Sequence, residues 1–148
     1  MNDTYEYKNL KMCFDSEFWE PVENYMGSLV TFFLTEKGRI ENDLEGFQPC
    51  VSFAVYENIQ IGIKLIFNNT CRDLKKYMQD LEIMKQHIQG NTCNFTYKGM
   101  NSNHAITCRQ VIKKINNDVV SITGGCSSEK FERFDKCIES LLEGFIGE

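Results

Sequence analysis

Apolar residues recur at helical spacing in two segments of the chain. The first, about Cys71–Ile88, has a three- and four-residue apolar repeat that predicts an amphipathic helix, with Thr70 placed to cap its start and Gly90 to end it. The second, about Ser128–Phe145, predicts another helix on the same grounds. The repeating residues are Leu74, Tyr77, Met78, Leu81, Met84 and Ile88 in the first segment, and Phe131, Phe134, Ile138, Leu141 and Phe145 in the second.

The other apolar runs are short and predict strands. Leu29–Leu34 is apolar on both faces, which is typical of a covered central strand. Ile59–Phe67 alternates strictly between apolar and other residues, as a half-buried strand does. Because short connections separate most of the strands, we expect a mainly antiparallel sheet. The predicted strands are Met12–Phe14, Leu29–Leu34, Val51–Val55, Ile59–Phe67, Cys93–Tyr97, Ala105–Ile112 and Val119–Thr123.

The order of these elements predicts a single α+β domain over residues 1–148. Both helices must dock their apolar stripes on the sheet, and whether they share a face decides whether an apolar sheet face stays open. The acidic segment Glu36–Phe47 predicts a solvated loop. Gly124 and Gly125, between a strand and a helix, indicate a tight turn with positive φ.

Composition narrows the class of partner. The 148 residues include 16 Lys and Arg against 21 Asp and Glu, a net charge of −5, which disfavours nucleic acid. The densest basic cluster, Arg109, Lys113 and Lys114, is interpreted as a solvated strand face. The first eight residues lack the basic and apolar regions of a signal peptide, and no apolar run approaches the roughly 20 residues that span a bilayer. We therefore expect a cytoplasmic protein without membrane insertion.

Residues that could carry chemistry are few. The seven cysteines are odd in number, dispersed and free of any Cys-x-x-Cys pattern, which predicts free thiols. His87 falls in the first predicted helix, beside its apolar stripe. His104 and Cys108 share a strand face but would lie roughly 13 Å apart, too far for a catalytic pair. We expect no cofactor, no metal site and no enzymatic activity; a thiol-dependent enzyme is the alternative.

A protein partner is the remaining expectation, and three aromatic residues are candidates to bind it. Tyr56 lies on the polar side of its strand, while Trp19 and Phe47 fall in predicted loops. Aromatic side chains dominate the energetics of protein interfaces, which favours these positions as anchors. The competing interpretation places all three in the core, and for Trp19 the core is favoured.

A series of features follows in a recognisable order along the chain: Phe14-Asp-Ser-Glu-Phe-Trp19-Glu, Leu29–Leu34, Val51–Val55, Asp73–Ile88, Phe95–Tyr97, Asn103-His-Ala105, Val119–Thr123, Lys130, Phe131, Phe134, Ile138, Leu142 and Phe145. This order resembles the PsbP-like superfamily, which also holds Ran-binding Mog-type proteins and Eag-type effector chaperones. The resemblance implies an α-β-α sandwich around an antiparallel sheet, and a non-enzymatic adaptor or chaperone role in binding another protein or an apolar segment. A longin- or profilin-like fold, with a trafficking function, is the alternative that the same order allows.

Overall fold

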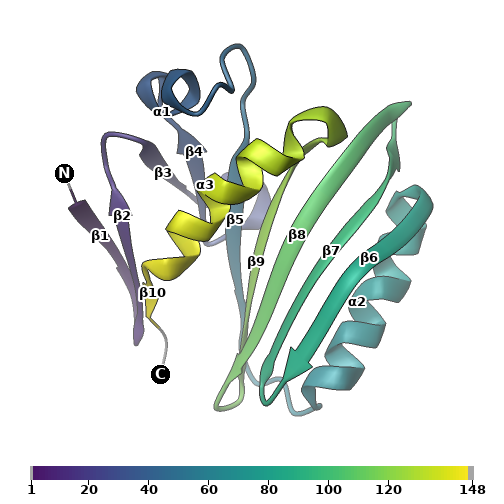
Figure 1. Ribbon diagram of the computed structural model, residues 1–148. Coiled ribbons are helices and arrows are strands. Elements are labelled where there is room, and N and C mark those ends of the chain that lie inside the picture. The colour runs from purple at the N-terminus through teal and green to yellow at the C-terminus, as the bar shows by residue number, and fades with distance from the viewer. Residues whose placement is uncertain (1, 147–148) are drawn as a thin grey trace.

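A computed structural model describes residues 2–146 (Figure 1). Its main element is a seven-stranded antiparallel sheet with the strand order β3-β4-β5-β9-β8-β7-β6. A smaller three-stranded sheet has the order β1-β2-β10. The strands are β1 (Asn2–Tyr7), β2 (Leu10–Asp15), β3 (Trp19–Glu23), β4 (Val30–Leu34), β5 (Cys50–Tyr56), β6 (Gln79–Gln89), β7 (Thr92–Asn101), β8 (His104–Ile115), β9 (Asp118–Ser127) and β10 (Phe145–Ile146).

The helices lie on opposite faces of the large sheet, so the fold is an α-β-α sandwich. Helix α3 (Phe131–Glu143) crosses the front face in Figure 1, where the small sheet also packs, and α2 (Ile63–Tyr77) lies behind β6–β8. Helix α1 (Glu36–Glu41) and two short 3-10 turns, η1 (Tyr25–Gly27) and η2 (Ser128–Lys130), complete the described elements. The predicted α+β class and antiparallel sheet are confirmed.

Strand alternation explains why the core divides into two parts. On β9, Val120 and Ile122 belong to the core beneath α3, whereas Val119 belongs to the core beneath α2. The α3-side core is the larger, and Phe32 at its centre has no exposed surface. The α2-side core is centred on Phe67 and Phe95, whose rings meet edge to face with centroids 4.9 Å apart.

The first predicted helix is wrong in position. The helical segment begins at Ile63, eight residues before the predicted start, and the chain from Gln79 to Gln89 is strand β6. The predicted strand Ile59–Phe67 is therefore also wrong, because most of it forms the first turn of α2. Register irregularities between Gln79 and Glu82 and between Ile83 and Lys85 break the alternation along β6. Such bulges give a strand apolar residues at spacings that imitate a helix.

Two further predictions are also wrong. The segment Glu36–Phe47 is not a solvated loop throughout: it contains α1, capped by the Thr35 hydroxyl, and Leu44 is completely buried. Gly124 and Gly125 lie inside β9 without positive φ. A Cβ on Gly124 would come within 2.6 Å of Ile138 Cδ1, and one on Gly125 within 2.6 Å of Cys108 Sγ. Close packing, rather than a turn, requires these glycines.

Candidate functional site

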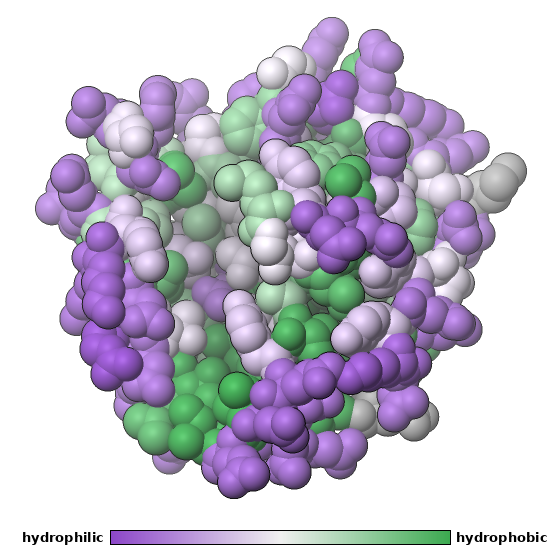
Figure 2. All heavy atoms as spheres, turned by 180° about the vertical axis from the view of Figure 1, so that it is seen from behind, coloured by the Kyte–Doolittle hydropathy of each residue, from purple (hydrophilic) through white to green (hydrophobic). Residues whose placement is uncertain are grey.

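A groove of about 570 Å³ runs between α2 and strands β5 and β9, on the sheet face opposite α3. Figure 2 looks onto this face and shows a hollow with apolar side chains gathered below it. The groove exists because α2 covers only the β6–β8 half of the face, and the described helices leave the β5 side open. It is lined by Ser52, Ala54, Tyr56, Ile59, Ile61, Ile66, Asn69, Thr70, Asp73, Leu74, Tyr77, Tyr97, Gln110, Ile112, Val119, Ser121 and Thr123.

The groove is apolar at one end and polar at the other. Tyr56 pairs with Val119 in the sheet, and beside them Ile59 and Ile61 precede the first turn of α2. Four residues farther along the same strands, Ser52 pairs with Thr123, and this level carries the hydroxyl-rich floor. The last turns of α2 supply the wall above that polar end. A ligand with an apolar part and a hydrogen-bonding part therefore matches the lining.

Two tyrosines stand at the ends of the groove. Tyr56 is 54% exposed on β5, and Tyr77 is 75% exposed at the end of α2. Both residues lie on regular secondary structure, so the sheet and the helix set the point from which each side chain extends. Tyr97, in contrast, is buried in the floor, and burial raises the pKa of its phenol far above the ordinary value.

The three predicted partner-binding residues occupy different environments. Tyr56 is exposed and lines the groove. Trp19 is only 4% exposed and packs in the α3-side core, so its candidacy as a surface anchor is withdrawn. Phe47 is partly buried against the same core, on the other side of the sheet from the groove. The structure therefore brings none of the three together. The second exposed aromatic residue of the groove is Tyr77, which the sequence pattern assigned to the apolar stripe of the first predicted helix.

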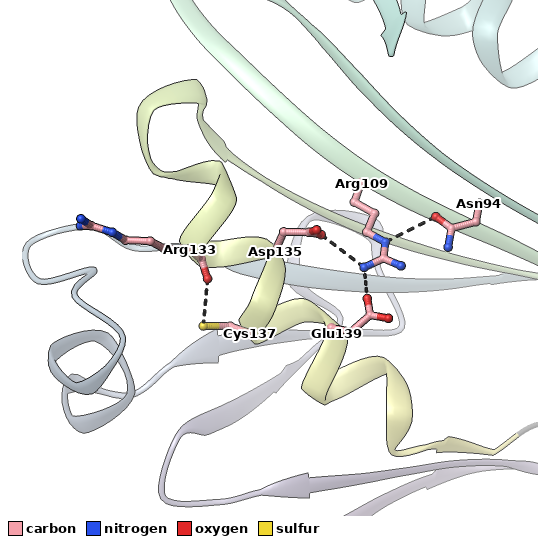
Figure 3. A network of polar contacts seen from close by, with 6 residues as sticks. All are labelled: Asn94, Arg109, Arg133, Asp135, Cys137 and Glu139. Atoms are coloured by element: carbon pink, nitrogen blue, oxygen red, sulfur yellow. Dashed lines mark hydrogen bonds and ion pairs between the residues drawn. The ribbon is translucent and has the colours of Figure 1, made fainter. Parts of the chain in front are cut away.

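A polar network on the opposite face fixes α3 to the sheet (Figure 3). The Arg109 guanidinium, on β8, pairs with Asp135 at 3.3 Å and with Glu139, and its Nε donates to Asn94 Oδ1 at 3.4 Å. Its side chain is only 14% exposed, so the predicted solvated basic face is wrong for this residue. Because Asp135 and Glu139 are one helical turn apart, a single guanidinium holds both, which is a structural role.

The cysteine environments argue against an activated thiol. All seven, which lie within the described residues, are free. Burial raises the pKa of Cys93 and Cys108 to about 11 and that of Cys126 to about 12. It also raises the pKa of Cys50, Cys71 and Cys137 above the ordinary value. A nucleophilic cysteine needs the opposite shift, because the thiolate is the reactive form.

We expect the folded protein to react slowly with iodoacetamide at neutral pH. Raised thiol pKa values lower the thiolate fraction, and burial limits access. In denaturant all seven thiols should titrate, and adding a reducing agent should leave the melting temperature unchanged. The measurement is alkylation followed by intact mass, with and without denaturant. One cysteine reacting much faster than the rest, or three or fewer titratable thiols, would contradict this account.

Metal-binding geometry is absent from residues 2–146: no group of three or more His, Cys, Asp or Glu side chains is placed to hold an ion. His87 is exposed on β6 rather than on a helix, and its Nε2 lies 3.2 Å from Gln89 Oε1. His104 begins β8, as predicted, and is exposed. Over the same described range, no helix is both long enough and apolar enough to cross a membrane.

The comparisons with known proteins identify a fold and no sequence relative. The sequence matches no protein-family model and no curated protein. Among solved structures, LpqN of Mycobacterium tuberculosis, described as involved in cell envelope biogenesis, superposes with a TM-score of 0.66 at 8% identity, over 98% of this chain and 89% of that one. PA94 of Pseudomonas aeruginosa, a protein of unknown function, gives 0.59 at 8% identity over 99% and 97%.

A third neighbour links the architecture to the resemblance seen in the sequence. Cyanobacterial PsbP (CyanoP) of Synechocystis sp. PCC 6803 superposes with a TM-score of 0.58 at 10% identity, over 99% of this chain and 92% of that one. Such low identities establish the architecture alone. The longin- or profilin-like alternative drew on a predicted strand at Ile59–Phe67, which from Ile63 onward is helical in the structure. Taken together, the strand order, the helices on opposite faces and these superpositions show that the chain has the PsbP-like fold.

Proposed function

We propose that the chain is a non-enzymatic protein-binding module, an adaptor or chaperone, that holds a segment of another polypeptide in the groove between α2 and β5. The observation that carries this proposal is the groove itself, with exposed Tyr56 and Tyr77 at its ends. Exposed tyrosines on rigid elements are favourable anchors because they bury a large area at little cost in side-chain entropy.

An extended occupant fits this surface better than a compact one. Beyond the groove, the same sheet face continues over β4 and β3, where Val22 and the Tyr25–Phe33 ring pair are partly exposed. A small molecule confined to the groove would leave those apolar side chains in water. A polypeptide segment can cover both regions, and its backbone can hydrogen-bond the Ser52 and Thr123 hydroxyls of the floor.

The descriptions of the structural neighbours are consistent with a non-catalytic role. LpqN is described by its involvement in cell envelope biogenesis, CyanoP as a PsbP protein, and neither description names a reaction. The raised thiol pKa values weigh against the thiol-enzyme alternative. We also propose a cytoplasmic location, because seven free thiols suit a reducing compartment.

Replacing Tyr56 with alanine is expected to weaken binding of a groove-selected peptide by roughly thirtyfold, since truncating an aromatic hot-spot residue costs about 2 kcal/mol. Peptides would be selected from a random display library on the immobilised full chain, and affinities measured by calorimetry. Tyr56 is half exposed, so the melting temperature should stay close to that of the unsubstituted protein.

Met84→Ala is the matched control, because Met84 is an exposed large apolar residue on β6 that does not line the groove. It should leave peptide affinity unchanged. The proposal fails if selected peptides bind equally to the Tyr56 variant. It also fails if the library yields no binder, and a metal or nucleotide bound at micromolar concentration in calorimetry would then identify a different class of ligand.

A further inference from the structure

One charged side chain, the Asp73 carboxylate, lines the groove and indicates which chemical group a ligand would place there. Among the described residues that line the groove, Asp73 is the only one with a formal charge. It lies near the end of α2, above the polar part of the floor. Its partner is Lys76, one turn along the helix, with 3.6 Å between Lys76 Nζ and Asp73 Oδ1. Both side chains of this pair are more than half exposed, so the pair is weak and a ligand can compete for the carboxylate.

Tyr77 stands beside this carboxylate. Asp73 and Tyr77 are four residues apart on α2, which places their side chains next to each other on one helix face. Both line the groove, so the carboxylate and the exposed ring border the same space. A carboxylate next to an accessible aromatic face suits a guanidinium, which can donate hydrogen bonds to the carboxylate and stack on the ring at the same time.

We propose that the polypeptide held in the groove carries an arginine that binds Asp73 and Tyr77, with a bulky apolar residue seated at the Tyr56–Ile61 end. This inference rests on the proposed function and names the partner's chemistry. The two ends can be related through the helix: from Ile63 to Asp73 α2 rises roughly 15 Å. An extended chain covers that distance in about four to five residues. The partner motif is therefore a large apolar residue separated from an arginine by about that spacing.

The test uses the peptides selected on the full chain. The selected set should be enriched in arginine at a fixed distance from a large apolar residue. Replacing that arginine with citrulline keeps the shape and removes the charge, and should weaken binding about tenfold, because both the ion pair and the ring contact lose the cation. Asp73→Asn should weaken binding of the arginine peptide about threefold to fivefold, and should leave binding of the citrulline peptide unchanged.

Asp80→Asn is the control for a lost negative charge, since Asp80 is exposed near the start of β6 and does not line the groove. It should leave the affinity of both peptides unchanged, apart from the small effect of a changed net charge. Two results would overturn this inference and leave the proposed function standing. One is a set of peptides whose binding depends on Tyr56 but which are not enriched in arginine. The other is a loss of binding free energy from citrulline and from Asp73→Asn that is simply additive. A library that yields no peptide would remove both.

Discussion

A chain that ends at Ser127 is expected not to fold. It lacks α3, which buries Phe134, Ile138 and Leu141 to 1% exposure or less. Each fully buried large apolar side chain contributes roughly 1.5–3 kcal/mol, and a domain has only about 5–15 kcal/mol of stability in total. The truncation also uncovers the sheet surface beneath the helix and leaves the Arg109 guanidinium without its two carboxylates.

Circular dichroism during thermal unfolding measures this result. The truncated chain should give no cooperative transition, whereas the full chain should give one. Two substitutions in the full chain separate helix packing from chain length: Phe134→Ala should cost about 3–5 kcal/mol, and Ser140→Ala, at an exposed position, should cost almost nothing. Cooperative unfolding of the truncated chain would show that α3 is an appendage to a sheet that is stable without it.

Replacing Phe32 with alanine is expected to lower the free energy of unfolding by about 3–5 kcal/mol. Phe32 has no exposed surface and meets three other rings edge to face: Tyr5 at 6.5 Å, Phe14 at 5.0 Å and Phe53 at 5.6 Å between centroids. Tyr5 and Phe14 belong to the small sheet, so Phe32 links the two sheets. Its loss leaves a cavity at their junction.

Phe33, the next residue on β4, is the matched control. Its side chain is half-buried on the opposite face, where it contacts Tyr25 at 5.1 Å between ring centroids. Phe33→Ala should therefore cost less than half as much in urea unfolding. Equal losses for the two variants would contradict the division of the core between the two sheet faces.

The sequence correctly predicted the elements in which the spacing of apolar residues is enough to show which side chains are buried. The second helix and the strands at Leu29–Leu34, Val51–Val55 and Val119–Thr123 were recognisable because each is long or regular enough to show its period. Positions in β6 and α2 were misassigned because bulges disturb the alternation, while Ile59–Phe67 alternates by chance over a helix start. Strands β1 and β3 were missed because most of their residues are exposed, so no alternation of buried and exposed positions marks them in the sequence.

The candidate site was only partly predictable for a related reason. Tyr56 was found, since alternation along β5 places it opposite the buried Val51 and Phe53. The groove depends on where α2 begins and which half of the sheet it covers, and no local pattern records either fact. The Arg109 network could not be predicted either, because it depends on α3 crossing β8. The spacing of Asp135 and Glu139 shows only that they share one polar side of that helix.

The most direct test of the groove's role is to map a bound peptide by amide chemical shifts. A peptide selected on the full chain would be titrated into isotopically labelled protein. If the groove binds polypeptide, the largest shifts should fall on Ser52–Tyr56, Val119–Thr123 and the Ile66–Tyr77 part of α2, while the amides of α3 and β1 stay unchanged. Shifts concentrated on α3, on β1 or along the outer edge of β6, with the groove residues unmoved, would contradict the account.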